Sequence, residues 1–291
     1  MTVYVSRTRC GFCFGVQRAV AIAEQALHVR RTLYSIGGLI HNEEQIRQLQ
    51  KKGMRVVRAI NEVPRGATLV VRSHGLSPRL ILQARAQGVR VIDATCPFVK
   101  IAHEAMKVLK NEGYFVLLLG DMHHPEVRTL RDIVGARQSK TVGPRQAVAA
   151  KTVFGKKIGV IAQTTQMPQA LEELARKTLA LRPRELRVYN TICRDVIERQ
   201  QEARTVARCV DVVFVIGGSN SANTTRLFQI CRAHNRRTFK IQNESMLQAR
   251  MVALARRIGI ITGASTPRFL VERVIERIGA YSAGQSQVIG V

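Results

Sequence analysis

Tryptophan is absent from this sequence, and aromatic residues of all kinds make up only 5% of it. Proteins that hold single-stranded nucleic acid stack the bases on such side chains, so the chain is poorly supplied for that role. Long apolar runs are missing too. The longest compact one spans residues 114–119, whereas a membrane helix needs roughly 18 or more. Met1 to Cys10 carries no signal-peptide core. We therefore expect a cytoplasmic protein with no membrane segment.

Acidic residues are also scarce. There are 20 of them against 46 basic residues, which gives a formal net charge of +26. Such a surface favours an anionic partner, namely nucleic acid, an acidic protein or a phosphorylated metabolite. The plainer interpretation is genomic, because 35 of the basic residues are arginine and a GC-rich genome produces that bias without selection for binding. The charge is spread along the chain without a basic tail, so we do not expect nucleic acid to be the main partner.

One spacing occurs three times among the six cysteines, and it organises the whole chain. A glycine follows 24 residues after each of three cysteines, in the pairs Cys13–Gly37, Cys96–Gly120 and Cys193–Gly217. Each cysteine follows a short apolar run and precedes a helical pattern. Each glycine ends a second apolar run, and a third run closes the unit before a proline. A period near 90 residues is too long for a solenoid, so we interpret the repeat as three packed α/β modules.

Alternating apolar runs and helical patterns predict small parallel sheets covered by helices. The expected fold class is therefore α/β, with three repeated modules in a pseudo-threefold arrangement around a central cluster site. We expect the modules to span residues 13–95, 96–192 and 193–291. The third module has no clear closing strand, so residues 1–12 are expected to complete its sheet.

Polar side chains follow the predicted strands in each module. The loops after parallel strands share one edge of their sheet, where ligands bind, and the helices that start there present backbone N–H groups suited to phosphate. Three cysteines in equivalent loops near helix N-termini suit a metal centre, because such positions stabilise thiolates. The alternatives are three buried structural cysteines and a closed zinc site with three cysteines and one histidine. Cys10 and Cys13 form a C-x-x-C, which alone could be a redox or zinc half-site.

Cys10 has no counterpart in the other repeats, so we interpret Cys13 as the ligand and Cys10 as incidental. Cys209 and Cys231 fall on the apolar faces of predicted helices, and we expect both in the core.

Eight short motifs stand in order along nearly the whole chain. Together they closely resemble the hydroxymethylbutenyl diphosphate reductase family (IspH/LytB) of the methylerythritol phosphate isoprenoid route. They are Gly11-Phe12-Cys13-Phe14-Gly15-Val16, Ile40-His41-Asn42, Arg72-Ser73-His74-Gly75, Asp93-Ala94-Thr95-Cys96-Pro97, His123-His124-Pro125-Glu126-Val127, Gln163-Thr164-Thr165, Asn190-Thr191-Ile192-Cys193 and Gly263-Ala264-Ser265.

The resemblance implies an iron–sulfur oxidoreductase that removes the hydroxyl of (E)-4-hydroxy-3-methylbut-2-enyl diphosphate, giving isopentenyl and dimethylallyl diphosphate. It implies one [4Fe–4S] cluster with three cysteine ligands and an open iron site, and an acidic electron carrier such as ferredoxin or flavodoxin. By motif, the cluster ligands are Cys13, Cys96 and Cys193. Glu126 resembles the family's proton donor, with Thr164 and His124 as its catalytic neighbours. The residues that resemble the diphosphate-binding set are His41, His74, His124, Ser221, Asn223 and Ser265.

The chain departs from the family in two places, each of which removes a hydroxyl near the expected site. Asp195 and Val196 stand where the family usually has Ala-Thr, and Ala222 stands where it commonly has a second serine. Two other functions therefore remain open at this point. One is a paralogue that binds a diphosphate without reducing it, and the other is a basic nucleic-acid or ribosome-associated protein on the same fold.

Overall fold

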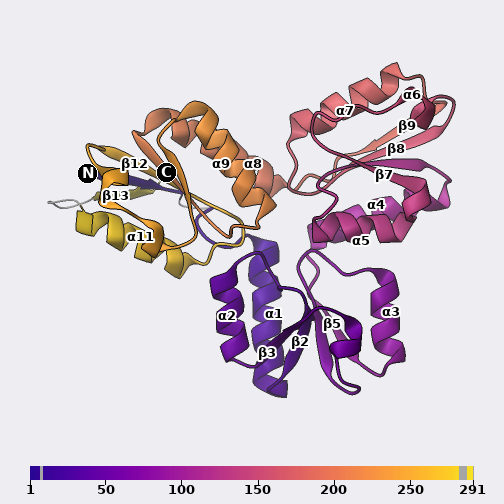
Figure 1. Cartoon of the computed structure of the whole chain (residues 1–291), viewed down its shortest axis with the longest axis horizontal. Coiled ribbons are helices and arrows are strands. Elements are labelled where there is room, and N and C mark those ends of the chain that lie inside the picture. The colour runs from indigo at the N-terminus through magenta and orange to yellow at the C-terminus, as the bar shows by residue number, and fades with distance from the viewer. Residues whose placement is uncertain (7–8, 282–286, 291) are drawn as a thin grey trace. The chain divides into compact units, whose positions relative to one another are not determined.

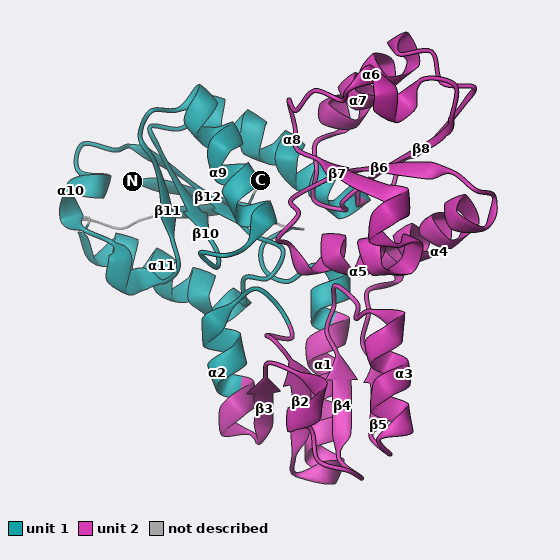
Figure 2. Ribbon diagram, turned by 45° about the vertical axis from the view of Figure 1, so that its right-hand side comes forward, with its two compact units in different colours: residues 1–17, 40–48, 194–291 teal, residues 18–39, 49–193 magenta. Residues whose placement is uncertain are grey.

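The computed structural model describes residues 1–6, 9–281 and 287–290. Figure 1 shows the chain as small sheets with helices packed against them. It divides into two compact units (Figure 2): residues 1–17, 40–48 and 194–291 form unit 1, and residues 18–39 and 49–193 form unit 2. Two of the four boundaries between the units fall inside helices, α1 (Phe14–Arg30) and α2 (Glu43–Lys51).

Unit 2 contains two four-stranded parallel sheets. The first has the order β3-β2-β4-β5, and its strands are β3 (Met54–Val57), β2 (Leu33–Ile36), β4 (Thr68–Val71) and β5 (Arg90–Asp93). The second has the order β7-β6-β8-β9, and its strands are β7 (Ser139–Val142), β6 (Phe115–Leu119), β8 (Lys157–Ala162) and β9 (Glu185–Tyr189).

Unit 1 contains the third parallel sheet, of order β11-β10-β12-β1-β13. Its strands are β11 (Thr238–Ile241), β10 (Val212–Ile216), β12 (Arg257–Thr262), β1 (Thr2–Val5) and β13 (Gln287–Gly290). The N-terminal strand β1 pairs with β12 from Thr2 opposite Arg257, which is the position that the sequence predicts for it. On its other side β1 pairs with β13, a strand that the sequence analysis missed. The fold class, α/β with three small parallel sheets, is therefore confirmed.

Helices complete the modules. In unit 2 these are α3 (Pro78–Ala86), α4 (Pro97–Asn111), α5 (Pro125–Val134), α6 (Ala150–Val153) and α7 (Pro168–Ala180), with 3₁₀ turns at Ile60–Glu62 and Ala136–Gln138. In unit 1 they are α8 (Arg194–Cys209), α9 (Ala222–His234), α10 (Ala249–Val252) and α11 (Arg268–Tyr281), with a 3₁₀ turn at Glu244–Met246. The division into three modules stays a prediction.

The central strands β4 and β10 are buried along their whole length, as expected for parallel sheets covered on both faces. In unit 2, helices α4 and α5 pack on β6 through Met106, Leu130 and Leu118. In unit 1, helices α8 and α9 cover one face of β10, and α11 contributes Val274 to the core on the opposite face. These cores fix the helices that begin at the carboxyl ends of the strands, where the expected functional residues lie.

Candidate functional site

Each of the three repeated cysteines lies between the end of a strand and the start of a helix. Cys96 follows β5 and is the N-cap residue of α4, Cys193 directly precedes α8, and Cys13 directly precedes α1. All three are half-buried, in contrast to Cys231, which is fully buried with its pKa raised by burial to about 12. A half-buried thiol beside a helix N-terminus is suited to metal ligation.

Each of the three cysteine loops also forms an equivalent backbone hydrogen bond. Each cysteine N–H donates to the carbonyl of a residue two positions beyond the end of the neighbouring strand. The pairs are Cys96 with Ser73 at 3.0 Å, Cys193 with Thr164 at 2.9 Å and Cys13 with Ala264 at 2.9 Å. The equivalence seen as a spacing in the sequence is therefore an equivalence of local geometry, and the donor chemistry of the three loops fits a thiolate-held iron–sulfur cluster.

The other cysteines differ from this pattern. Cys10 packs against the core of the sheet in unit 1, and burial raises the pKa of its thiol. Cys231 lies in the core as predicted, but the prediction for Cys209 is wrong, because its side chain is exposed. Cys209 is the last residue of α8, and it lies off the buried face of that end of the helix, which Val206, Ala207 and the following Val210 form.

Glu126 is the buried carboxyl group of the site. It lies in the first turn of α5 and is fully buried. Thr164, in the loop after β8, binds both of its oxygens. The Thr164 N–H donates to Oε1 at 2.7 Å, and the hydroxyl Oγ1 lies 2.8 Å from Oε2. Burial raises the pKa of Glu126 to about 7 although both contacts with Thr164 act to lower it. A carboxyl group with this pKa can give up a proton at neutral pH.

His124 caps the same helix. Its Nδ1 accepts a hydrogen bond from the Glu126 N–H at 3.2 Å, which requires that nitrogen to be unprotonated. In a neutral ring the proton then lies on Nε2, so that His124 is a donor at the ring's far edge. The ring of His74 meets it edge-on at 5.3 Å between centroids, and the His74 Nδ1 lies 3.5 Å from the hydroxyl of Ser73. Unit 2 thus brings His74, His124, Glu126 and Thr164 together.

In unit 1 a second polar group gathers around the start of α9. Ser221 is the N-cap residue, and its hydroxyl accepts from the Thr224 N–H at 3.2 Å. Ser265 donates its hydroxyl to the carbonyl of His41 at 3.0 Å. Gly218 packs so closely on that carbonyl that a Cβ would lie 2.3 Å from its oxygen, so the loop before α9 requires glycine there.

Asn223, in unit 1, has a buried side-chain amide that is available to bind a ligand. Its side chain is 4% exposed, and within the described ranges neither its Oδ1 nor its Nδ2 has a hydrogen-bond partner. An unpaired buried amide costs roughly 1–3 kcal/mol, a cost that a polar ligand would remove. Asn223 is the second residue of α9, a helix whose N-terminal N–H groups attract anions.

The motif Gln163-Thr164-Thr165 contains two further side chains to which the sequence assigned no role. Thr165 Oγ1 and Gln163 Nε2 are buried and, among the residues that the structure describes, have no hydrogen-bond partner. They flank Thr164, and the signal that could have assigned them was the unusual run of three polar residues after a buried strand. His41 departs from repeat symmetry, because Asn42 and not His41 provides the side chain that caps α2, accepting from the Gln45 N–H at 3.0 Å.

No helix among the described residues is long and apolar enough to cross a membrane.

Comparisons with known proteins identify the family of the chain. The family model described as LytB protein matches residues 4–279. A 4-hydroxy-3-methylbut-2-enyl diphosphate reductase of Geobacter sulfurreducens is 40% identical over 275 residues, covering 93% of this chain and 94% of its own length. The reductase of the same name from Aquifex aeolicus is 38% identical over 277 residues, covering 94% of this chain and 95% of its own length.

Solved structures show the same likeness. One is that of an (E)-4-hydroxy-3-methyl-but-2-enyl diphosphate reductase, the terminal enzyme of the non-mevalonate pathway; it is 37% identical with a TM-score of 0.69, over 96% of this chain and 100% of that one. Another, an E-1-hydroxy-2-methyl-but-2-enyl-4-diphosphate reductase from Plasmodium falciparum, is 22% identical with a TM-score of 0.88 over 100% of this chain and 92% of that one. The second supports the fold.

Proposed function

The chain belongs to the LytB protein family, and from this premise we propose that it converts (E)-4-hydroxy-3-methylbut-2-enyl diphosphate to isopentenyl and dimethylallyl diphosphate. It is an oxidoreductase of isoprenoid biosynthesis. The observation that carries the assignment to this chain's own residues is the fully buried Glu126, whose pKa lies near neutrality and whose two oxygens are both bound by Thr164.

We propose that Cys13, Cys96 and Cys193 hold one [4Fe–4S] cluster, with one ligand from each module. Iron–sulfur clusters usually take four cysteines, so three leave one iron open. When bound, such a cluster supplies electrons and a Lewis-acidic site for the substrate hydroxyl. The support lies in the three equivalent cysteine loops with their matching backbone hydrogen bonds. Thiol ligands of this kind suit the reducing cytoplasm.

Glu126 supplies the proton that the reaction needs. Replacing an allylic hydroxyl by hydrogen consumes two electrons and two protons and releases water, and the hydroxyl leaves as water only if it is protonated. A carboxyl group with a pKa of about 7 is protonated in a large fraction of molecules at neutral pH. When it is, its hydroxyl donates to Thr164 Oγ1, which leaves the Thr164 hydroxyl proton for the substrate oxygen. Thr164 therefore orients the acid and extends its reach.

The diphosphate is proposed to bind to His41, His74, His124, Ser221, Asn223 and Ser265. Support comes from the amide of Asn223, which has no hydrogen-bond partner in the described part of the chain. His124 adds a second donor, because its Nδ1 accepts from Glu126 and a neutral ring then carries its proton on Nε2. Hydrogen bonds to a charged diphosphate are about twice as strong as neutral ones. Ser265 donates to a carbonyl here, so its hydroxyl must rotate to donate to the diphosphate.

The departures from the family leave this set in place. Val196 is buried and apolar, and Ala222 is the first residue of α9, between Ser221 and Asn223, both of which are retained. We also propose an acidic electron carrier such as ferredoxin or flavodoxin, supported by the net charge of +26.

Anaerobic single-turnover reduction of the allylic diphosphate tests the function. Protein with its iron bound and then reduced should release the two isomeric products, and Cys96→Ser should release neither. Iron-containing protein that binds the diphosphate without converting it would overturn the proposal in favour of a non-reducing paralogue.

A further inference from the structure

Arg199 is a buried cation that the proposed chemistry does not use. It lies on α8, and its side chain is only 3% exposed. Its Nε donates to Oδ2 of Asp195, one helical turn earlier, at 2.8 Å. Burying a guanidinium is unfavourable unless its donors are satisfied, so the partners of the remaining N–H groups show what the residue does.

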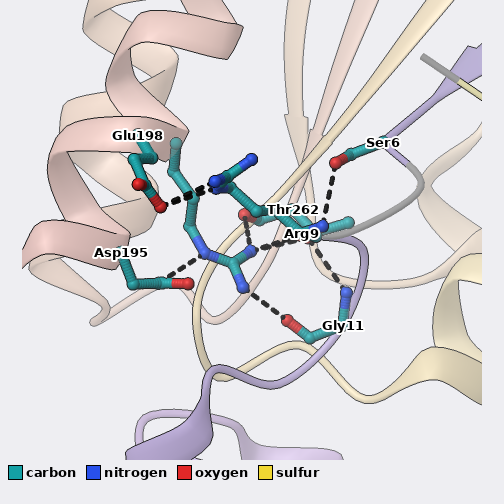
Figure 3. A network of polar contacts seen from close by, with 7 residues as sticks. Ser6, Arg9, Gly11, Asp195, Glu198 and Thr262 are labelled. Atoms are coloured by element: carbon teal, nitrogen blue, oxygen red, sulfur yellow. Dashed lines mark hydrogen bonds and ion pairs between the residues drawn. The ribbon is translucent and has the colours of Figure 1, made fainter.

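Those donors bind the loop that carries Cys13. Arg199 Nη1 donates to the Arg9 carbonyl at 2.5 Å, and Nη2 donates to the Gly11 carbonyl at 3.2 Å. The two carbonyls flank Cys10, and Gly11 has φ +103°, a conformation that favours glycine. The planar fork of arginine thus binds two points of one tight turn, whose residues Arg9 and Gly11 are labelled in Figure 3.

Thr262, at the end of β12, completes the attachment. Its hydroxyl donates to the Arg9 carbonyl at 3.0 Å and accepts from the Gly11 N–H at 3.2 Å and from Arg199 Nη1 at 3.1 Å. One donor and two acceptor positions are the full capacity of a hydroxyl. Arg199 Nη1 also lies 3.1 Å from the Thr262 carbonyl. The turn is therefore held by two side chains that are themselves bound to each other.

We propose that Arg199 and Thr262 are positioning residues for Cys13, and that they fix the turn Arg9–Cys13 so that its thiol is presented in one place. The inference rests on the proposed function only in taking Cys13 as a cluster ligand. Beyond the turn, Cys13 is held by its own N–H bond to Ala264. Thr262 ends β12 and Ala264 follows two residues later, so this strand end and Arg199 of α8 together fix the position of the ligand.

Asp195 has a role in this account. It stands at one of the positions where the chain departs from the family, and it neutralises the buried Arg199 from within α8. A second pair runs alongside, between Arg9 Nη2 and Glu198 Oε2 at 2.6 Å. Asp195, which stands where the family usually has alanine, therefore stabilises the cation that holds the cysteine turn.

The test measures the reactivity of individual cysteines in full-length protein from which iron has been removed by chelation. Alkylation by iodoacetamide is followed by mass spectrometry, and the rate at Cys13 is divided by the rate at Cys96. Arg199→Lys keeps the charge but loses the fork. Thr262→Val keeps the shape but loses the hydroxyl. Arg194→Lys is the control, since Arg194 lies on the same helix, is 87% exposed and pairs with Glu198.

Freeing the turn should raise the Cys13-to-Cys96 ratio about tenfold in both variants, the effect of losing one or two hydrogen bonds, and leave it unchanged in the control. Should Arg199→Lys fail to fold, Thr262→Val decides. An unchanged ratio in folded variants, or equal acceleration at both cysteines, overturns the inference. A raised ratio in a protein that never binds iron would instead refute the cluster proposal and leave the positioning role standing.

Discussion

Thr164 binds both carboxyl oxygens of Glu126 from 38 residues away, with its backbone N–H on one oxygen and its hydroxyl on the other. The carboxyl group is thereby fixed in one orientation in a fully buried setting. Neither contact involves a charged partner, so burial remains the larger effect on its pKa. The pair combines a proton that is held at neutral pH with a hydroxyl that can pass it on.

The first prediction concerns stability and pH. The pKa of Glu126 is about 7 when folded, against an ordinary value of 4.5, so the folded state binds this proton more tightly than the unfolded state. That contribution to stability is complete below the ordinary pKa and is lost as the pH rises through about 7. Glu126→Gln has no such dependence. Relative to the wild type, it should therefore gain stability between about pH 5 and about pH 8.

Urea denaturation at several pH values checks this, with Glu43→Gln as the matched control because it also lies in the first turn of a helix but is exposed. A stability difference between wild type and Glu126→Gln that does not vary with pH would contradict the raised pKa.

The second prediction concerns the cysteines. Replacing Cys13, Cys96 or Cys193 by serine should abolish stable iron binding, because three ligands are the minimum in this account. Cys209→Ser should leave the iron content unchanged, since that side chain is exposed at the end of α8. Iron and sulfide analysis of anaerobically purified variants measures both. Loss of iron in Cys10→Ser together with its retention in Cys193→Ser would refute the ligand assignment.

The third prediction compares two asparagines at opposite ends of α9. Asn223→Leu removes a buried amide whose two polar atoms have no partner in the described part of the chain, so it should stabilise the protein by about 1 kcal/mol. It should also raise the KM for the diphosphate roughly tenfold or more, through loss of a charge-assisted hydrogen bond.

Asn235→Leu is the control. That amide donates to two carbonyls and accepts from the Arg237 N–H, so its loss should destabilise the protein by about 1–3 kcal/mol without a comparable change in KM. Destabilisation by Asn223→Leu with an unchanged KM would assign that amide to structure.

The fourth prediction uses the charge. A net charge of +26 should accelerate encounter with an acidic electron carrier at low ionic strength. The rate of turnover should fall steeply between about 0.01 M and about 0.1 M salt, as the Debye length shortens from about 30 Å to about 10 Å. Turnover with dithionite serves as the control. Equal salt sensitivity with both reductants would remove this role for the charge.

Much of the fold could be predicted because repeats and apolar runs are local properties of a sequence. The Cys13–Gly37 spacing and its two copies indicated three sheets, and the missing fourth strand of the last module indicated the position of β1. Strand β13 could not be predicted in the same way, since its pairing with β1 joins the two ends of the chain.

The site was less predictable where it depends on contacts between distant residues. Glu126 and Thr164 were recognised by motif. One of the two hydrogen bonds to the Glu126 carboxyl group comes from the backbone N–H of Thr164, however, and a sequence motif does not show such a contact. No motif drew attention to Arg199, because its contacts with Arg9 and Gly11 lie about 190 positions away in the chain. Cys209 was misplaced because the buried face of α8 follows Val206, Ala207 and Val210, and Cys209 lies beside that face.

The most direct test of the central claim, that Glu126 is the proton donor, is the single-turnover rate of Glu126→Gln with the allylic diphosphate. The variant keeps the shape and hydrogen bonding of the side chain but has no acidic proton. We expect iron content and substrate affinity close to those of the wild type, with reduction slower by about a hundredfold or more, the scale of general acid catalysis. A rate per cluster within a few-fold of the wild type, together with a lowered melting temperature, would show that Glu126 has only a structural role and would contradict the account.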